Sequence, residues 1–351
     1  MQSIKVIFVL IIVILTGCKK EENNDPSTPE SFSNGILVLN EGLFQQNNST
    51  LSWIDLSKNE VIHDIFLAKN NRLLGDTGND LKKYGSKIYV VVNASSTIEV
   101  LDSKTLTSIK QISLSLNGQA QEPRKITFWK NKAFVSSFDG FVNIIDTASL
   151  NVINRIQVGQ NPEGISVAGD QLFVANSGGL NFPNVDSTVF KIDLINEVIV
   201  DTFTVGKNPG DVYARTDGSV YVVKRGDYAG DPSELVRIDS NTGQVTSLGF
   251  PVSSLSVKND ILVIAYYDYN SGNSNVSNYD MTSQQMISSS TINSNQVSTL
   301  YGAYLLPDNR TVALDAMNFT NTGYLRIFGT NGMIESSFEV GLNPNNIIVY
   351  E

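Results

Sequence analysis

Val158-Gly159-Gln160-Asn161-Pro162 is a phrase that the sequence uses three times. It returns 47 residues later at Val205–Pro209, and once more at Val340–Pro344. Glycine tolerates a positive φ angle, and proline fixes its own φ while it pushes the preceding asparagine away from the helical region, so the phrase is typical of a tight turn. A turn that recurs at such a spacing indicates an internal repeat.

An aspartate that follows an apolar residue marks the same period. Six such pairs occur, separated by 47, 44, 47, 46 and 41 residues: Ile54-Asp55, Leu101-Asp102, Ile145-Asp146, Ile192-Asp193, Ile238-Asp239 and Tyr279-Asp280. An aspartate at the point where a strand enters a tight turn accepts a hydrogen bond from the backbone two residues further on. We therefore expect these carboxylates to be structural rather than catalytic.

Each unit has the pattern of four antiparallel strands. An apolar triplet appears seven times, at residues 37–39, 88–90, 133–135, 172–174, 220–222, 262–264 and 312–314. Within residues 123–159, β-branched and aromatic residues alternate with period two over four segments, 124–128, 132–137, 141–145 and 152–158. No segment shows a sustained helical period. Seven such units predict an all-β fold, a seven-bladed β-propeller of four-stranded blades.

The two ends of the folded region complement each other. It starts with Gly35–Leu39, the second strand of a unit whose first strand is missing, and it ends with Asn345–Tyr350, a first strand with nothing after it. We therefore expect one propeller over residues 35–351, in which the C-terminal strand joins the N-terminal blade. Closing the ring removes exposed sheet edges that favour aggregation.

Residues 1–17 have the pattern of a secretory signal peptide. Lys5 precedes an uninterrupted apolar run, Val6–Leu15, which is too short to cross a bilayer. Leu15-Thr16-Gly17-Cys18 resembles a bacterial lipobox, which implies lipidation of Cys18. Lys19–Glu22 resembles the surface-export signal of Bacteroidota lipoproteins, with a plain charged tether as the alternative. We expect residues 18–34 to form a flexible tether, and the protein to be lipid-anchored in the outer membrane, facing the cell exterior.

Composition and motifs argue against several classes of function. The net charge of −10 disfavours binding to nucleic acid. Cys18 is the only cysteine and His63 the only histidine, so the sequence has no disulfide pair and no cysteine or histidine cage for a metal. Quinone-dependent dehydrogenase propellers carry a Trp-ending motif in each blade, and this chain has only Trp53 and Trp129. We predict no cofactor, no metal and no catalysis; a hydrolase that uses carboxylates alone stays open.

The loops that join second to third strands are the expected place for function. In a propeller they share one face with the loops between blades, around the axis. Five of them are long (residues 40–49, 176–186, 224–234, 266–275 and 315–323), and two are short (93–97 and 138–140). Long loops on a rigid scaffold commonly carry function.

The content of these loops suits a large ligand. Aromatic faces beside amides and a few cations match a molecule with flat apolar and amide surfaces, although the same residues could pack the loops against one another. The candidate ligand-binding residues are Phe44, Gln45, Arg124, Phe138, Asn176, Phe182, Lys224, Arg225, Tyr228, Tyr267, Tyr269, Phe319 and Asn321.

The sequence resembles the YncE-like, YVTN-repeat surface β-propellers, and within them the Bacteroidota lipoproteins typified by the cobalamin-binding BtuG proteins. The resemblance covers roughly residues 35–351 and rests on Leu39–Phe44, Asn48–Ser52, Asp55, Gly75-Asp76 and the repeated Val-Gly-x-Asn-Pro phrase. It implies capture of a corrinoid at the cell surface, beside a TonB-dependent outer-membrane transporter that receives it. Without a histidine in place to ligate cobalt, we expect recognition by shape and hydrogen bonds.

Two other functions stay open. The first is a surface propeller that binds another ligand, such as a glycan, or a protein partner. A glycan site needs a stacking aromatic flanked by carboxylates, which Tyr228 with Asp227 and Asp231 could supply. The second is a hydrolase with an acidic site on the axis.

Overall fold

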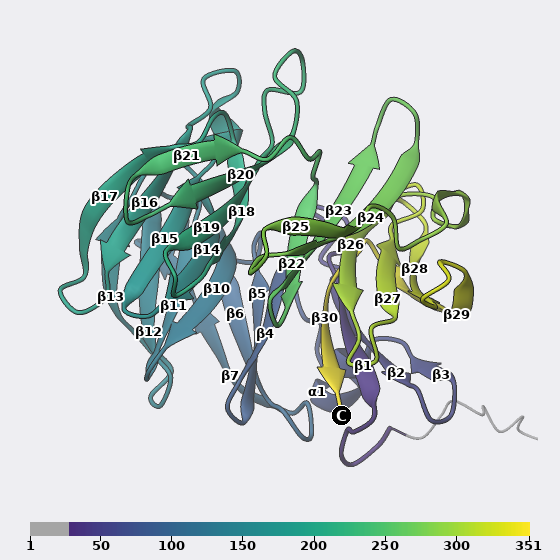
Figure 1. Ribbon diagram of the computed structural model, residues 1–351. Coiled ribbons are helices and arrows are strands. Elements are labelled where there is room, and N and C mark those ends of the chain that lie inside the picture. The colour runs from purple at the N-terminus through teal and green to yellow at the C-terminus, as the bar shows by residue number, and fades with distance from the viewer. Residues whose placement is uncertain (1–27) are drawn as a thin grey trace, which may run out of the picture.

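Seven four-stranded antiparallel sheets surround a common axis in the computed structural model, which describes residues 28–351 (Figure 1). The predicted signal peptide, residues 1–17, and Cys18 lie outside the described residues. Each sheet is one blade, and the first strands of neighbouring blades contact each other, so these strands line the axis. The predicted all-β seven-bladed propeller is confirmed.

The strands of the blades follow one another from the axis outward. Blade 1 contains β30 (Pro344–Tyr350), β1 (Gly35–Asn40), β2 (Thr50–Asp55) and β3 (Glu60–Ile62). Blade 2 contains β4 (Gly78–Tyr84), β5 (Lys87–Val92), β6 (Thr97–Asp102) and β7 (Ser108–Ser113). Blade 3 contains β10 (Pro123–Trp129), β11 (Lys132–Ser137), β12 (Phe141–Asp146) and β13 (Asn151–Gln157). Blade 4 contains β14 (Pro162–Ala168), β15 (Gln171–Asn176), β16 (Thr188–Asp193) and β17 (Val198–Thr204).

The last three blades have the same order. Blade 5 contains β18 (Pro209–Ala214), β19 (Ser219–Lys224), β20 (Glu234–Asp239) and β21 (Gln244–Ser247). Blade 6 contains β22 (Ser254–Lys258), β23 (Ile261–Asp268), β24 (Asn273–Asp280) and β25 (Gln285–Ser288). Blade 7 contains β26 (Leu300–Leu305), β27 (Thr311–Asp315), β28 (Thr322–Phe328) and β29 (Ile334–Leu342).

Four short elements lie outside the blades. The helix α1 (Ile65–Asn70) and the hairpin of β8 (Ser115–Leu116) and β9 (Gln119–Ala120) precede and follow blade 2. The 3-10 turns η1 (Gly179–Asn181) and η2 (Ser294–Gln296) lie in loops. The helix α1 is too short to give a sustained helical period. Asp64 caps its N-terminus by accepting a hydrogen bond from the Leu67 N–H at 3.1 Å.

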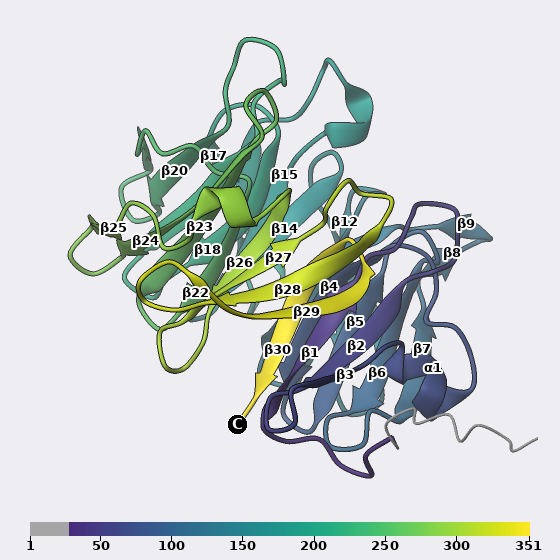
Figure 2. The ribbon, with the colours of Figure 1, turned by 90° about the vertical axis from the view of Figure 1, so that its right-hand side faces the viewer.

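The two ends of the chain close the ring, as the sequence predicts. β30 pairs antiparallel with β1, with Val38 opposite Ile347 and Gly35 opposite Tyr350. Figure 2 shows β30 lying beside β1. The Tyr350 ring packs edge-on against Trp53 at 5.2 Å between centroids, and its hydroxyl donates to the Ser103 carbonyl at 2.9 Å. The last strand is thereby tied to blade 1 and to blade 2.

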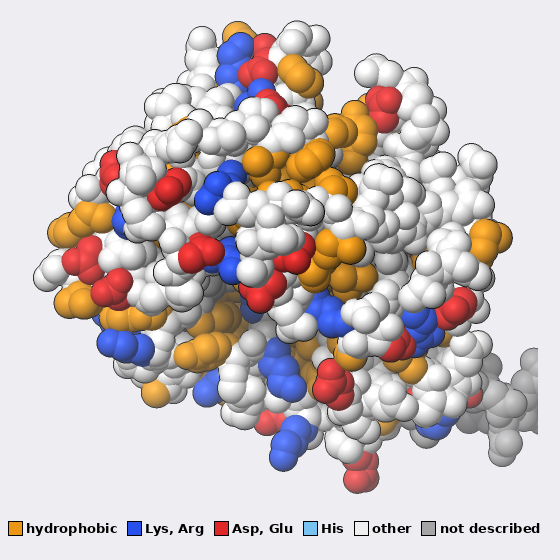
Figure 3. Space-filling model, viewed as in Figure 1, with side chains coloured by type: hydrophobic (Ala, Val, Ile, Leu, Met, Phe, Trp, Pro, Cys, Tyr) orange, Lys and Arg blue, Asp and Glu red, His pale blue; other side chains and the backbone are white. Residues whose placement is uncertain are grey.

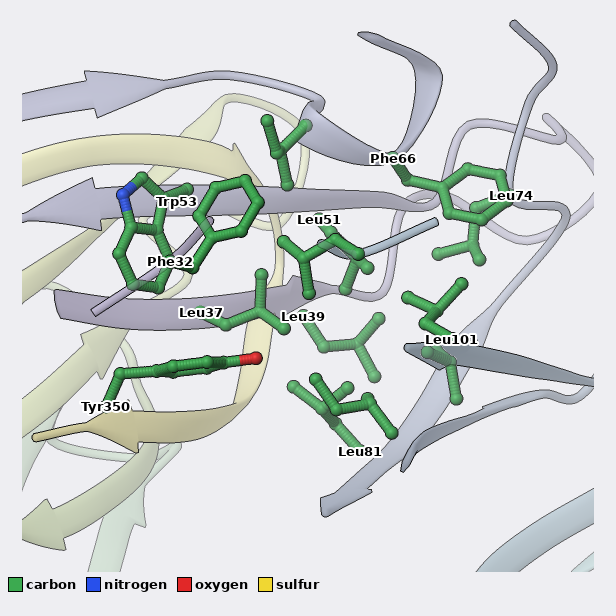
Figure 4. Close-up of a cluster of buried hydrophobic side chains, with 14 of the residues drawn as sticks. Phe32, Leu37, Leu39, Leu51, Trp53, Phe66, Leu74, Leu81, Leu101 and Tyr350 are labelled. Carbon is green, nitrogen blue, oxygen red and sulfur yellow. The ribbon is translucent and has the colours of Figure 1, made fainter. Parts of the chain in front are cut away.

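The hydrophobic core is divided into seven clusters, and each cluster fills the space between two neighbouring blades. The cluster between blades 1 and 2, for example, contains Leu37 and Trp53 from blade 1 with Leu81 and Val90 from blade 2 (Figure 4). The cluster between blades 7 and 1 likewise brings Leu314 against Val38. Because every blade buries both of its faces in this way, no blade is expected to be stable without its neighbours.

The six periodic aspartates have the structural role that the sequence predicts. In every case the Oδ1 atom accepts a backbone N–H two residues further on, at 2.8–3.2 Å: Ser57, Lys104, Ala148, Ile195, Asn241 and Thr282 are the donors. The pKa of Asp146 is lowered by the backbone and side-chain hydrogen bonds from Ser149. Such turns join third to fourth strands and hold the outermost strand in register.

The Val-Gly-x-Asn-Pro turns differ from the expectation in their backbone. It is the asparagine that takes the left-handed conformation, with φ of 43°, 56° and 53° at Asn161, Asn208 and Asn343, whereas of the three glycines only Gly206 has a positive φ. Close packing explains the glycine elsewhere, because a Cβ at Gly159 would lie 2.5 Å from the Asn176 side chain. Asparagine tolerates this left-handed backbone better than most residues.

The predicted tether is partly folded. Phe32 is buried and packs edge-on against Trp53 at 4.8 Å (Figure 4). Its N–H donates to the Lys104 carbonyl at 3.0 Å, and the Asn34 carbonyl accepts from the Leu56 N–H at 3.3 Å. Phe32 and Asn34 therefore lie against blades 1 and 2. Phe32, an apolar aromatic residue in a polar segment, is the sequence feature that could have predicted this contact.

The closing strand can be tested through Tyr350. Replacing Tyr350 with Ala removes a buried ring from the contact with Trp53, so we expect the free energy of unfolding to fall by about 3–5 kcal/mol. Chemical denaturation measures this directly. The exposed Tyr269 provides the control, because Tyr269→Ala should change stability by less than about 0.5 kcal/mol. Equal effects of the two substitutions would contradict a closing role for β30.

Candidate functional site

The loops that join second to third strands gather at one end of the propeller, which we call the upper face (Figure 1). The long loops span residues 41–49, 177–187, 225–233 and 316–321, and the short ones span residues 93–96, 138–140 and 269–272. The loop of blade 6 is shorter than expected, because β23 and β24 extend as a hairpin. Tyr267 consequently lies in β23 and not in a loop.

A cavity of about 560 Å³ runs along the axis below this face, and we call it the axial cavity. The first strands of all seven blades line it. Its upper mouth is formed by residues at the start of these strands, among them Arg124, Glu163, Tyr301 and Asn345, together with Glu41 and Arg225 from loops. The repeat thus places side chains of different chemistry, among them Arg124, Glu163 and Asn345, at equivalent positions around one opening.

Glu163 is the centre of a buried ion-pair cluster at this mouth. Its carboxylate accepts from the Arg124 guanidinium at 2.8 Å (Nη2–Oε1) and 3.1 Å (Nε–Oε2), and the Arg225 Nη2 lies 3.8 Å away. The side chain of Glu163 is only 2% exposed. Burial acts to raise the pKa of Glu163, but the charges of Arg124 and Arg225 outweigh it and lower the pKa to about 2. The cluster is therefore ionised at neutral pH.

Arg225 has donors left over for a ligand. Within residues 28–351, its guanidinium makes no hydrogen bond, and its contact with Glu163 is at ion-pair distance only. Burial acts to lower the pKa of Arg225, and the negative charges of Glu163 and Asp211 raise it overall, so the group is cationic. An arginine has five N–H donors, and the Arg225 side chain lines the axial cavity.

Gly210 makes room for Arg225. A Cβ on Gly210 would lie 2.7 Å from the Arg225 Nε, so the guanidinium lies directly over the backbone of β18. Gly164 is constrained by the neighbouring strand, because a Cβ added to it would lie 2.2 Å from the Gly210 carbonyl oxygen. These two glycines allow the first strands of blades 4 and 5 to approach each other at the axis.

Glu41 and Tyr301 form a second polar group on the opposite side of the mouth. The Tyr301 hydroxyl donates to the Glu41 carboxylate at 2.6 Å, and the Asn345 amide donates to the same oxygen at 3.4 Å. Burial, followed by the charge of Glu41, raises the pKa of the Tyr301 hydroxyl well above its usual value. The phenol therefore remains a neutral hydrogen-bond donor. The Phe319 ring packs edge-on against Tyr301 at 5.8 Å.

Exposed aromatic rings stand around the mouth. Tyr228 and Tyr269 are 75% and 74% exposed, and Phe44 is 67% exposed. Tyr269 packs edge-on against Tyr267 at 4.8 Å, and the Arg124 guanidinium lies over the Phe138 ring at 4.5 Å. Hydrophobic side chains are visible below the upper loops in Figure 3. Large exposed aromatics in one region of a monomer are typical of a binding surface.

A second, open groove of about 580 Å³ lies on the upper face between blades 3 and 4. Phe138 and Phe141 line one side, and Leu180, Asn181 and Asp186 line the other. Phe182, which is exposed, follows in the same loop. Phe138 therefore stands between this groove and the axial cavity, where it stacks with Arg124.

The structure divides the predicted ligand-binding residues into three sets. Arg124, Phe138, Arg225 and Phe319 lie at or beside the mouth of the axial cavity. Solvent-exposed positions in the loops, or next to them, are occupied by Phe44, Gln45, Phe182, Tyr228, Tyr269 and Asn321, with Tyr267 half-buried beside Tyr269. Asn176 and Lys224 form the third set, and their polar groups are already engaged.

Asn176 and Lys224 are structural residues. Asn176 is fully buried, where its Oδ1 accepts from the Gly159 N–H at 3.0 Å and its Nδ2 donates to the Thr188 Oγ1 at 3.0 Å. The Lys224 ammonium pairs with Asp231 at 2.8 Å and with Glu234 at 3.1 Å. We therefore leave both out of the candidate site.

Sequence reasoning missed Glu41, Glu163 and Tyr301. The prediction gave most weight to the second-to-third loops and their aromatic content, whereas Glu163 and Tyr301 lie at the start of first strands. A usable signal was present, because Arg124, Glu163, Gly210 and Asn345 each follow the proline of a repeat turn. The residue after that proline lines the axial cavity in three of these blades, at Arg124, Glu163 and Asn345.

Within residues 28–351, no group of three or more His, Cys, Asp or Glu side chains is arranged to hold a metal ion. In the same range, no helix is long and apolar enough to cross a membrane.

Comparisons with known proteins place the chain in a family. The profile of a family described as "Domain of unknown function (DUF5074)" matches residues 34–305. No match was found among the curated proteins.

Solved structures support the fold alone. Hydrazine synthase of Kuenenia stuttgartiensis has a TM-score of 0.58 at 13% identity, over 74% of this chain and 85% of the other. The computationally designed Ika8 protein has a TM-score of 0.55 at 15% identity, over 90% of this chain and 91% of the other. The Pan2 WD40 domain of Neurospora crassa has a TM-score of 0.53 at 9% identity, over 78% of this chain and 81% of the other.

The pH dependence of stability tests the cluster around Glu163. Its pKa of about 2 in the folded chain lies below the usual 4.5, so its contribution to stability is complete above about pH 4.5 and is lost as the pH falls toward 2. We expect the wild-type chain to lose about 3 kcal/mol more than Glu163→Gln over this window, as measured by denaturant unfolding at several pH values. Identical pH profiles would show that Glu163 is not held ionised by the two arginines.

The two axial glycines give a matched pair of substitutions. Gly164→Ala drives a Cβ into the Gly210 backbone, so we expect a loss of about 1–3 kcal/mol in the free energy of unfolding. Gly210→Ala meets only the flexible end of Arg225 and should leave the thermal midpoint nearly unchanged. A larger loss of stability for Gly210→Ala than for Gly164→Ala would contradict this account of the axis.

Proposed function

We propose that this chain, which belongs to the family described as "Domain of unknown function (DUF5074)", binds a corrinoid at the upper mouth of the axial cavity. In this proposal the protein is a surface lipoprotein that is anchored through Cys18 in the outer membrane. It captures the ligand without catalysis and passes it to a TonB-dependent transporter.

The observation that carries the proposal is the pairing of Arg225, whose donors are open, with exposed aromatic rings at the same mouth. A corrinoid is a broad ring edged with carboxamides. Carboxamide oxygens accept hydrogen bonds from a guanidinium, and the flat ring offers an apolar face to side chains such as Tyr228 and Tyr269. Ligand pockets commonly combine many apolar contacts with a few polar groups that fix orientation.

The charge balance of the mouth favours a ligand rich in neutral polar groups. Arg124 and Arg225 are opposed by Glu163 and Asp211, and Glu41 lies across the opening. A strongly anionic or cationic ligand would meet an unfavourable charge on one side. Carboxamides carry both donors and acceptors, so they can pair with either side without a net charge.

Cobalt ligation by histidine is not part of the proposal. His63, the only histidine, follows β3 at the outer edge of blade 1, whereas the axial cavity is lined by first strands. Recognition would therefore rest on shape, aromatic contacts and hydrogen bonds. The opening motif, Leu39–Phe44, adds support from sequence, and it places Glu41 at the mouth and Phe44 on the upper face.

A glycan is less well supported as the ligand. The carboxylates that flank Tyr228 are already engaged: Asp227 accepts the N–H groups of Ala229, Gly230 and Asp231 at 2.9–3.1 Å and pairs with Lys207 at 2.9 Å. Asp231 pairs with Lys224 at 2.8 Å. These internal bonds leave fewer acceptors for sugar hydroxyls beside the Tyr228 ring.

Calorimetric titration of cyanocobalamin tests the proposal. The chain lacking residues 1–18 contains every described residue, and we expect it to bind one ligand per chain. Arg225→Gln and the pair Tyr228→Ala with Tyr269→Ala should each weaken binding at least about tenfold, which corresponds to about 1.4 kcal/mol. Ile287→Ala, an exposed apolar residue on the outer strand β25, is the control and should leave affinity unchanged.

The absence of heat together with the absence of a thermal shift at high micromolar cyanocobalamin would exclude the corrinoid. If the two upper-face variants and the control had the same affinity for cyanocobalamin, the ligand would bind elsewhere on the chain.

A further inference from the structure

The charges of this chain are unevenly distributed along its length. Residues 28–132, which form most of blades 1 and 2 and the first strand of blade 3, contain 12 Lys and Arg against 10 Asp and Glu. Residues 133–351 contain 10 Lys and Arg against 22 Asp and Glu. The propeller therefore has a charge gradient across its ring, although its net charge is −10.

Exposed lysines of the first three blades gather at the end opposite the upper face, which we call the lower face. They lie in or next to turns that join first to second strands or third to fourth strands, and all such turns open to this face (Figure 1). These lysines are Lys58, Lys82, Lys83, Lys104 and Lys130.

Four of these lysines are available to a partner. Within the part of the chain that the structure describes, Lys82, Lys83, Lys104 and Lys130 form no ion pair, and Lys58 has only a 3.5 Å contact with Asp55. Lys83 and Lys130 lie over the rings of Tyr350 and Trp129, at 5.0 Å and 4.1 Å from the centroids. Such stacking holds the stems against the protein while the ammonium groups remain exposed.

The acidic side chains nearest to these lysines face inward to their own turns. Asp102 Oδ1 accepts the N–H groups of Lys104 and Thr105 at 2.9 Å and 3.0 Å, and Asp146 is engaged in the same way. The turns that join first to second strands differ between the two sides: in blades 2 and 3 they carry no acidic residue, whereas in blades 4 to 6 they carry Asp170, Asp217 and Asp260, the last two paired with Arg215 at 3.0 Å and 2.7 Å. Asp193, Asp239 and Asp280 hold third-to-fourth turns in the same way as Asp102 and Asp146. The lower face is thus basic on one side of the axis and acidic on the other.

The N-terminal segment reaches the propeller at the basic side. The Lys69 ammonium donates to the Pro29 carbonyl, and Phe32 packs on Trp53 and donates its N–H to the Lys104 carbonyl. Residues 29–34 therefore run across the lower turns of blades 1 and 2. Phe32 lies only 14 positions after Cys18, so a membrane anchor at Cys18 would hold this side of the propeller close to the lipid.

We propose that the lower face of blades 1 to 3 is a docking surface for anionic lipid headgroups. Lysines near a membrane surface gain from its negative potential, and the acidic turns of blades 4 to 6 are repelled by it. The propeller then rests on the membrane on its basic side, with the upper face directed away from the lipid and open to a ligand. This proposal depends on the charges of the lower face and not on the identity of the ligand.

Vesicle co-sedimentation of the chain lacking residues 1–18 tests the proposal, because this chain has no lipid of its own. We expect binding to vesicles of equimolar phosphatidylcholine and phosphatidylglycerol at low salt, and none to pure phosphatidylcholine. The triple variant Lys82→Gln, Lys83→Gln and Lys104→Gln should lower the partition coefficient more than about tenfold. The matched variant Lys191→Gln, Lys207→Gln and Arg310→Gln removes the same charge from blades 4, 5 and 7 and should bind like the wild type.

Salt provides a second test that needs no substitution. Binding through headgroup charge must weaken as the ionic strength rises, because the Debye length falls to about 3 Å at 1 M salt. Equal binding to both vesicle types, binding that persists at high salt, or equal losses in the two triple variants would each overturn the proposal.

Discussion

The pairing of β30 with β1 is the constraint on which the rest of the structure depends. β30 contributes Ile347 to the cluster between blades 7 and 1 and Tyr350 to the cluster between blades 1 and 2, so both clusters depend on its place in the ring. The closing strand also joins residues from the two ends of the chain at the axis. Asn343 donates to the Gly42 carbonyl at 3.0 Å, and Asn345 donates to Glu41 at 3.4 Å. The upper mouth is complete only when the ring is closed.

Closure then decides the chemistry of the axial cavity. Glu163 lies among first strands from which water is largely excluded, where a lone carboxylate would be neutral. Arg124 and Arg225 reverse that outcome, and Gly210 lets the second arginine lie over the strand. Arg225 gives its charge to this cluster, but within residues 28–351 its guanidinium makes no hydrogen bond. The same packing that stabilises the axis therefore leaves an arginine with open donors at the opening.

The repeat made most of the fold predictable. The spacing of the six aspartates, the apolar triplets and the unmatched end strands were enough to give seven blades and their closure. Details that depend on tertiary contacts were not predictable. Asn176 was expected to face a ligand. Its side chain instead accepts the Gly159 N–H and packs closely against Gly159, so it holds a repeat turn. Lys224 pairs with acids seven and ten residues further on, and Glu163 meets arginines from two other blades. Nothing local in the sequence shows such pairs.

The two faces of the ring have different characters. The upper face combines exposed aromatics with a polar, charge-balanced opening, and the lower face carries unpaired lysines beside the N-terminal segment. Hydrogen exchange, followed by mass spectrometry with and without cyanocobalamin, tests most directly whether the upper mouth is the binding site. The account predicts slower exchange in residues 225–233, 269–272 and 316–321, and no change in the lower turns at residues 55–59 and 102–107. Protection confined to the lower turns or to the outer strands would contradict it.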